Sequence, residues 1–519
     1  MIVPRECSSG RWLTMVAGID LPADMSSRVR LAAERLRGSE RVMAVSHIDA
    51  DGICAQAVMI RTVERLGKYV SWKSIPQLSS ESVTGLADSV RKERPDLVVF
   101  TDLGTGQLNL IKSEILSIDC VREVLILDHH LPQDPEDDRT TEGVTEVNPN
   151  LHALDGSRDL SGAGTAFLVA LEVDRKNTDL SELAVVGASG DLQDYYGRGM
   201  SGVNREIVAL AEEEGVVRVC RDLTFFGINT RPLPMLLEYT TEPYLPGLTG
   251  NREACYRFFA ERGIPLKDDD QWRTWSDLSE TEKKTVIQGL VLIMLEAYDD
   301  PAVVEGIIGD IYVLLRRPLR TEMRNAKEFS TLLNACGRNR EPEVGVRVCL
   351  GSQEAYERAS SLLHQHRMNL AQALGRLASN GYMERPGMYV VNDPLTPDTI
   401  IGIVIGMAQG ARLVPTDRPV IGVCPSASED SQMVKISGRA QMSLIERGVN
   451  LKEAFARSAM ILNERHKTFL AEGGGHPMAA GAFVRNEYLD EYLDLVSSTI
   501  SEMLSTPQRK ERPPPDTSD

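Results

Sequence analysis

Between residues 41 and about 128, short apolar runs alternate with segments that have the composition and length of helices. The apolar runs cover residues 42–45, 97–100 and 124–127, and the helical segments cover residues 53–66 and 79–93. This alternation is typical of βαβ units and predicts an α/β fold built on a parallel sheet. Because parallel strands end at the same edge of a sheet, the residues after these runs should gather at that edge, where open α/β sheets bind ligands.

Acidic and histidine side chains follow each of the three apolar runs. They are His47, Asp49 and Asp51 after the first run, Asp102 after the second, and Asp128, His129 and His130 after the third. A single His-x-Asp at a strand end is often only a hydrogen-bonded turn. Three such clusters together are different, because each unpaired buried charge costs several kcal/mol unless cations compensate it. The set therefore predicts a metal site at the carboxyl edge of the sheet.

A further carboxylate, Asp191, ends the apolar segment that begins at residue 183, although this segment could also be an ordinary helix end. The combined set supplies enough oxygen and nitrogen ligands for two divalent ions. Carboxylate and imidazole without thiolate favour Mn²⁺ or Mg²⁺, with Zn²⁺ or Co²⁺ as alternatives in vitro. Two ions about 3.5–4 Å apart can activate water and stabilise the leaving oxygen of a phosphoryl displacement. His152 lies in a turn-like stretch and is expected at the surface.

The composition limits the class of protein. A chain of 519 residues is too long for one core, and no apolar run reaches the roughly 18 residues that span a bilayer. There is no apolar signal core near the N-terminus, and the eight cysteines are scattered, so we expect reduced thiols and a cytoplasmic protein. The net charge of −18 argues against a protein that coats duplex DNA by bulk electrostatics. A groove that is locally basic, and that binds nucleic acid, is still compatible with this net charge.

The texture of the sequence changes along the chain and suggests several domains. We expect a helix at 24–38, a polar surface loop at 132–146, mainly helical structure at 250–315 with a buried helix at 286–295, and one long helix at 352–379. Four prolines between 232 and 246 mark the start of an insertion, and strands and a helix return after residue 386. The expected division is 1–230, 231–320, 321–385 and 386–505, with a Pro-rich disordered tail at 506–519.

These motifs resemble those of the DHH phosphoesterase superfamily. Residues 46–52, Asp102, Asp128 to His130 and Asp191 look like its motifs I to IV, and residues 473–481 (GGGHPMAAG) look like the glycine-rich motif of the DHH-associated C-terminal domain. The two motifs occurring together are specific, and the resemblance covers residues 40–230 and 386–500. Residues 322–329 and 332–338 are similar to archaeal RecJ-like exonucleases, including the GINS-associated nuclease, and the insertion fits that subgroup.

The resemblance implies a role for each matched residue. His47, Asp49, Asp51, Asp102, His129 and Asp191 match metal ligands. His130 matches the second histidine of the motif, which is expected near the scissile phosphate in a catalytic role. Asp128, which we also expect to be catalytic, would support the ligands or serve a metal indirectly. Bacterial RecJ often has an aspartate at the position of His47, so whether His47 binds a metal directly stays open.

The expected substrate-binding residues lie in the second half of the chain. Gly473, Gly474 and Gly475 let backbone N–H groups approach a phosphate and His476 can donate to it, although a tight turn between secondary elements would have the same composition. Arg439 lies in a Ser-Gly-Arg segment that resembles the family's contact with the substrate backbone. Arg324 and Arg338 belong to an arginine-rich region that fits a nucleic-acid groove or a solvated helix face equally well.

The resemblance implies a metal-dependent exonuclease that removes nucleotides 5′→3′ from single-stranded DNA in replication or repair. The strand would lie in a cleft between the DHH and C-terminal domains. Three alternatives remain open: a 3′→5′ exonuclease on RNA, a phosphodiesterase for short oligonucleotides or cyclic dinucleotides, and a replisome scaffold that bridges GINS and the MCM helicase. Aromatic residues make up only 5% of the chain, which favours a grip on phosphates over a long base-stacking surface.

Overall fold

The computed structural model describes residues 5–6, 12–16, 18–132, 142–194, 199–240, 243–298, 304–426 and 432–505. The chain divides into two compact units, residues 1–364 and 365–519. Each unit has its own sheet and its own hydrophobic core. The expected boundaries at residues 230, 320 and 385 stay predictions, and the expected disordered tail lies outside the described residues.

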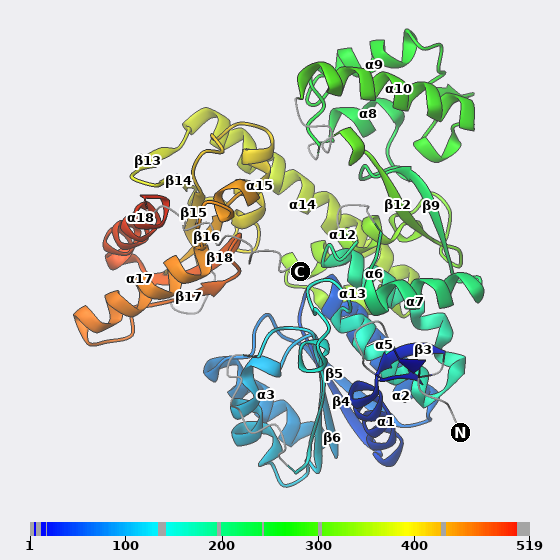
Figure 1. The fold of residues 1–519 in the computed structure, drawn as a ribbon, viewed down its shortest axis with the longest axis vertical. Helices are drawn as coiled ribbons and strands as arrows, with labels where there is room; N and C mark the ends of the chain where they lie inside the picture. Colours follow the sequence, from blue (N-terminus) through cyan, green and yellow to red (C-terminus); the bar gives the residue numbers. More distant parts are fainter. Residues whose placement is uncertain are drawn as a thin grey trace, which may run out of the picture. The chain divides into compact units, whose positions relative to one another are not determined.

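A five-stranded parallel sheet forms the centre of the first unit (Figure 1). Its order is β5-β4-β6-β7-β8, with β4 at Arg41–Ser46, β5 at Tyr69–Ser74, β6 at Leu97–Thr101, β7 at Glu123–Leu127 and β8 at Val144–Val147. The strands β4, β6 and β7 are adjacent, and Ser46, Thr101 and Leu127 are aligned at their carboxyl ends. The predicted α/β fold with a parallel sheet is therefore confirmed, and three ligand-bearing strands end side by side.

Helices cover both faces of this sheet. They are α1 at Ala23–Gly38, α2 at Ala50–Arg65, α3 at Ser80–Glu93, α4 at Leu108–Ile111, α5 at Gly162–Val173, α6 at Ser181–Gly190 and α7 at Gly202–Glu213. One face packs against α1, α2 and α5, and the other against α3 and α4. Asp49 caps α2 and Ser161 caps α5, each accepting a hydrogen bond from the third residue of the helix. These caps fix where the two helices begin.

An insertion with its own core extends from an antiparallel pair of strands in the first unit (Figure 1). The pair is β9 at Val217–Leu223 and β12 at Ile308–Leu314. Between them lie α8 at Leu233–Glu238, α9 at Arg252–Ala260, β10 at Lys267–Asp268, β11 at Gln271–Trp272 and α10 at Glu280–Ala297. Its core is built around fully buried Phe259 and Trp275. A small sheet of β1 at Arg5–Glu6, β2 at Trp12–Val16 and β3 at Ile19–Pro22 precedes α1.

Three expectations about this unit are wrong. The loop expected at 132–146 contains β8, because Val144–Val147 pairs with β7 and completes the sheet; residues 133–141 lie outside the described part. The helical region expected at 250–315 ends in the strand β12. The segment 286–295 is only half buried, since Leu292 and Leu295 are 62% and 54% exposed on the outer face of α10.

Three helices follow the insertion: α12 at Ala326–Arg338, α13 at Pro342–Cys349 and α14 at Gln353–Asn380. The predicted long connecting helix is α14. Its first half packs on the core of the first unit and its second half on that of the second. None of the helices in the described ranges is long and apolar enough to cross a membrane. The seven described cysteines are all free.

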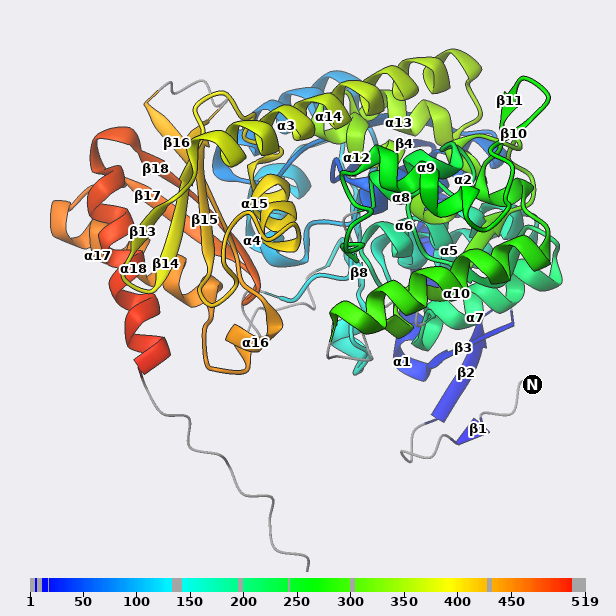
Figure 2. The same cartoon turned by 90° about the horizontal axis from the view of Figure 1, so that it is seen from above.

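The second unit is a six-stranded mixed sheet between helices (Figure 2). Its order is β13-β14-β15-β16-β18-β17, with β13 at Met383–Arg385, β14 at Met388–Asn392, β15 at Val420–Pro425, β16 at Met433–Arg439, β17 at Ala471–Gly475 and β18 at Ala479–Arg485. The helices are α15 at Ile401–Gly410, α16 at Met442–Ile445, α17 at Leu451–His466 and α18 at Leu489–Ser505. Helices α17 and α18 cover one face and α15 the other, so the smaller α/β domain is confirmed.

We predict that Gly473→Ala destabilises this sheet and that Gly474→Ala does not. A methyl group at Gly473 would lie 2.8 Å from the backbone oxygen of Phe455 in α17, whereas at Gly474 it would face open space. Overpacking of this kind costs about 1–3 kcal/mol. Thermal unfolding followed by circular dichroism measures the difference, and equal stability of the two variants would contradict this packing.

Glu328 makes the stability of the first unit depend on pH. Its side chain is 1% exposed and accepts hydrogen bonds from Asn229 and Thr230 at the start of the insertion, and burial raises its pKa to about 7. The folded state then holds a proton that the unfolded state releases near pH 4.5, so stability falls as the pH rises from 4.5 through 7.

We therefore expect Glu328→Gln to remove this loss and to be more stable than the wild type at pH 8, by up to roughly 3 kcal/mol. Urea unfolding at pH 5 and pH 8 tests this. Glu343→Gln changes the same charge at an exposed position of α13 and serves as the control. A wild-type stability that is flat across this range would show that Glu328 is ionised in the fold at no cost.

Candidate metal centre

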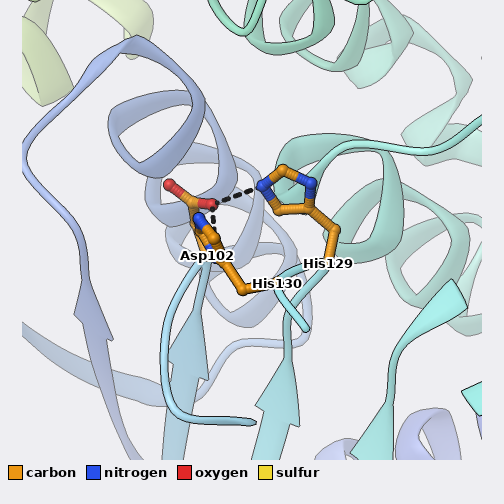
Figure 3. Close-up of side chains that lie close together, drawn as sticks. All are labelled: Asp102, His129 and His130. Carbon is orange, nitrogen blue, oxygen red and sulfur yellow. Dashed lines mark ion pairs between the residues drawn. The ribbon is translucent and has the colours of Figure 1, made fainter. Parts of the chain in front are cut away.

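The carboxyl ends of β4, β6 and β7 and the end of α6 bring six predicted ligands together. Asp102, which follows β6, lies in the middle and is 1% exposed. On one side Nε2 of His129 lies 3.1 Å from Oδ1 of Asp102, 3.2 Å from Oδ2 of Asp191 and 3.7 Å from Oδ2 of Asp51. In Figure 3, dashed lines join one carboxylate oxygen of Asp102 to the rings of His129 and His130.

The second oxygen of Asp102 faces a different group of ligands. Nδ1 of His47 lies 3.6 Å from Oδ2 of Asp102 and 2.9 Å from Oδ2 of Asp49. Three overlapping sets can each surround an ion, and Asp102 belongs to the sets formed with His129 and His130 and with His47 and Asp49. The remaining set is Asp51, His129 and Asp191. Asp102 could therefore offer one oxygen to a cation on each side.

The unsatisfied atoms of the centre fit such cations. Both carboxylate oxygens of Asp102, Nε2 of His129 and Nδ1 of His47 are buried without a hydrogen-bond partner. Nδ1 of His129 lies 2.6 Å from the carbonyl oxygen of Gly156 and donates to it, so the lone pair of Nε2 in the neutral ring faces the Asp102 and Asp191 oxygens. Acceptors that face acceptors repel, and buried polar atoms are rarely left this way. Oxygen and imidazole donors suit Mn²⁺ and Mg²⁺.

The pKa values of the ligands indicate the same need for positive charge. Burial, together with the charges of Asp191 and Asp102, raises the pKa of Asp51 well above its usual range. Burial alone would lower the pKa of His129, but the carboxylates of Asp102 and Asp191 outweigh it and raise that pKa. Four carboxylates this close together, of which Asp51 and Asp102 are fully buried, need positive charge among them, as protons or as bound cations.

Several residues that the sequence did not single out hold the ligands in place. The N-terminus of α5 donates to both oxygens of Asp51, from Gly162 at 2.6 Å and Ala163 at 3.0 Å, where the helix dipole favours an anion. Gln193 donates to the Gly156 carbonyl that fixes the His129 ring. Such outer contacts orient a ligand for its metal. The Ser161 cap signals α5, but nothing local in the sequence connects it to Asp51.

Asp128 supports the centre from outside these three sets. Its Oδ1 lies 2.8 Å from Nδ1 of His130 and accepts the backbone N–H of His129, and its Oδ2 accepts the N–H of Thr105. Burial by itself would lower the pKa of His130, but the Asp128 carboxylate raises it to about 9. The His130 side chain is 49% exposed. Asp128 therefore orients a half-exposed histidine that lies beside Asp102 and His129.

The structure adds an unusual backbone angle at Asp102 and corrects the expected environment of His152. Asp102 has a φ of 58°, a left-handed conformation that costs energy for a non-glycine residue and is typical of functional sites. His152 is not a free surface residue: its side chain is 9% exposed and Nδ1 lies 2.8 Å from Asp24 of α1. The turn that contains it supplies Asn150, whose amide donates to the His129 carbonyl.

The expected phosphate-binding residues of the second unit lie on a hairpin. Gly473 to Gly475 form the end of the edge strand β17, and His476 is exposed in the turn to β18, where its N–H donates to Ala479. Arg439, at the end of β16, is paired with Ala479 in the neighbouring strand. The second unit thus brings Arg439 close to the turn that carries His476, and their contact with substrate stays a prediction.

The two remaining arginines have different surroundings. Arg338, at the end of α12, lies close enough to Asp49 for their charges to interact, and its burial lowers its pKa. Arg324 donates through Nη1 to the backbone oxygens of Leu314, Leu315 and Arg317. Arg324 therefore stabilises the end of β12, and its contact with substrate stays a prediction.

Two family models match this chain. The DHH family, N-terminal domain, matches residues 41–190, which contain five of the six predicted metal ligands and end one residue before Asp191. The DHH-CID domain matches residues 225–308. The chain therefore contains a DHH-family N-terminal domain at residues 41–190 and is RecJ-like. An uncharacterized protein of Methanocaldococcus jannaschii is 29% identical over 465 residues, covering 89% of this RecJ-like chain and 94% of that protein.

Other relatives carry the RecJ name. The single-stranded-DNA-specific exonuclease RecJ of Haemophilus influenzae is 22% identical over 482 residues, 92% of this chain and 69% of that protein. The match to RecJ of Thermus thermophilus is 29% identical but spans only 36% of this chain and 27% of that protein.

Solved structures share the fold. RecJ of Thermus thermophilus in complex with Mn²⁺ superposes with a TM-score of 0.54 at 19% identity, covering 92% of this chain and 55% of that one. CDC45 of Entamoeba histolytica superposes with a TM-score of 0.60 at 13% identity, covering 92% and 98%. This RecJ-like chain therefore spans about half of the Thermus thermophilus RecJ chain.

We expect Mn²⁺ to raise the melting temperature of the wild type and Asp102→Asn to abolish the rise. An ion that binds only the folded state stabilises it by about 2.7 kcal/mol at one hundred times its Kd. Without metal the variant should be at least as stable as the wild type, because one repelling charge is gone. Asp179→Asn breaks the ion pair with Arg65 at the far end of α2 and should keep the full rise. An equal rise in Asp102→Asn would rule Asp102 out as a ligand.

Proposed function

We propose that this chain is a metal-dependent exonuclease that hydrolyses phosphodiester bonds of single-stranded nucleic acid. The observation that carries the proposal is the buried Asp102 carboxylate, with one unsatisfied oxygen toward His129 and the other toward His47. Two divalent cations held by these residues would supply the chemistry of phosphoryl displacement. The DHH-family N-terminal domain supports a hydrolase of phosphate esters.

The ligands would be His47, Asp49, Asp51, Asp102, His129 and Asp191, and they would hold two ions, with Mn²⁺ first and Mg²⁺ second. Bound there, the ions would activate a water molecule and offset charge on the phosphate. The half-exposed His130, fixed through Nδ1 by Asp128, is placed to donate its other ring N–H to a phosphate oxygen. Arg338 lies close to Asp49 and would pair with a phosphate of the strand.

The second unit would bind the strand through Arg439, His476 and the edge of β17. Arg439 and His476 offer side-chain donors at the same end of neighbouring strands, and Gly474 leaves the backbone open to a close approach. The grip would be on phosphates and therefore tolerant of base sequence. The names of the RecJ relatives support single-stranded DNA as the substrate. We propose removal of nucleotides 5′→3′ in replication or repair, with 3′→5′ cleavage of RNA as the alternative.

The experiment that decides is digestion of 5′- and 3′-labelled single-stranded DNA and RNA with Mn²⁺, Mg²⁺ or chelator. We expect early release of the 5′-labelled mononucleotide from DNA with Mn²⁺ and no reaction with chelator. Asp49→Ala/Asp51→Ala should lose the activity by at least about 10³-fold, since two of the three ligand sets each lose a carboxylate. Full activity in chelator would contradict the mechanism, and cleavage of dinucleotides alone would make the protein a short-oligonucleotide phosphodiesterase.

A scaffold role is the second candidate, and the fold shared with CDC45 favours it. The insertion has its own buried core and an outer face on α10 with exposed Leu292 and Leu295, so it could hold a protein partner without the metal centre. We propose GINS and the MCM helicase as partners. Co-purification that survives in Asp49→Ala/Asp51→Ala would separate this role from nuclease activity, and its absence in the wild type would exclude it.

A further inference from the structure

Helix α12 packs against the beginning of one ligand-bearing helix and the end of another. Ser330 of α12 and Ala50 of α2 both pack against Gly190, the residue before Asp191. Further along α12, Gly337 faces the carbonyl oxygen of Ile48, and a methyl group at Gly337 would lie 2.0 Å from that oxygen. The ligand loop, residues 47–51, is therefore held against α12 with no room for a side chain between them.

Asn334 makes a hydrogen bond between α12 and this loop. Its Oδ1 accepts the backbone N–H of Ala50 at 3.0 Å. Ala50 is the first residue of α2 and is fully buried, so its N–H has no partner within the helix and no access to bulk water. Oδ1 of Asn334 is therefore the acceptor for an N–H group that neither α2 nor solvent can satisfy.

The peptide that Asn334 holds lies between two predicted ligands. Asp49 precedes Ala50 and Asp51 follows it. Asp49 uses Oδ1 to accept the N–H of Gly52 and turns Oδ2 toward His47, and Asp51 uses both oxygens to accept N–H groups of α5. A rotation of the Ala50 peptide would move both carboxylates, one in each half of the centre. The contact from Asn334 is what opposes this rotation from the outside.

We propose that Asn334 is a positioning residue, which fixes the ligand loop through the Ala50 N–H and so sets the affinity of the centre for divalent cations. The proposal rests on the metal centre of the proposed function. Contacts that orient metal ligands are typically worth about 10–100-fold in metal affinity when removed. The carboxylate of an aspartate at this position keeps an acceptor of the same reach, whereas alanine leaves the buried N–H unpaired.

Titration of the full-length protein with Mn²⁺, followed by electron paramagnetic resonance of the free ion, tests the proposal without any substrate. We expect Asn334→Ala to bind Mn²⁺ at least about 10-fold more weakly than the wild type and Asn334→Asp to stay within about threefold of it. Asn339→Ala is the matched control, because Asn339 follows the same helix and donates to Ala335 and Leu362 instead. It should keep the wild-type affinity.

The outcomes separate positioning from a purely structural role. Wild-type Mn²⁺ affinity in Asn334→Ala, with a lower melting temperature in chelator, would overturn the proposal. So would an Asn334→Asp variant as weak as Asn334→Ala, because the acceptor would then not be the cause. If Asn334→Ala does not fold, Asn334→Ser, whose hydroxyl is too short to reach, takes its place with the same expected loss. A wild type that binds no Mn²⁺ would instead overturn the metal centre itself, and the proposed function with it.

Discussion

The arrangement of the first unit depends on how four neighbouring carboxylates, two of them fully buried, tolerate one another. Asp51, Asp102 and Asp191 surround Nε2 of His129 within 3.7 Å, and Asp49 lies on the opposite side of Asp102 beside His47. In a medium of low polarity their repulsion is severe unless positive charge lies among them. In the protein without cations, burial and the neighbouring carboxylates raise the pKa of Asp51, and the carboxylates outweigh burial to raise the pKa of His129, so that both groups hold protons more tightly. Divalent cations supply the same charge without protonating the ligands.

The surrounding elements keep this unfavourable cluster from relaxing. The N-terminus of α5 holds Asp51, the Gly156 carbonyl holds His129, and Asn334 of α12 holds the peptide between Asp49 and Asp51. Asp102 keeps a left-handed backbone at the end of β6. Strain and unpaired atoms collected at one place are characteristic of a site whose stability was exchanged for function. The buried helices on the sheet provide the rigidity for it.

The two units divide the chemistry. The first holds the predicted ligands, Asp128 and His130, while the second offers Arg439 and His476 at one end of a mixed sheet. The link between them is a single helix, α14, whose halves pack on different cores. Metal binding can therefore be studied apart from substrate binding, since no predicted ligand comes from the second unit. The insertion has a hydrophobic core of its own, separate from the cores of the two sheets.

The sequence by itself determined the parallel sheet, the six predicted ligands and the long helix α14, because these follow from local patterns: apolar runs, the polar residues directly after them, and an uninterrupted stretch of helix formers. Pairing across the chain decided the rest. Val144–Val147 and Ile308–Leu314 become strands only because β7 and β9 offer partners, so composition pointed to a loop and a helix instead. The sequence does not distinguish Arg324 from Arg338, because the backbone carbonyl oxygens that accept hydrogen bonds from Arg324 are known only from the structure. Asn334 reaches Ala50 over 284 residues of chain, and only the folded structure brings such a donor and acceptor together.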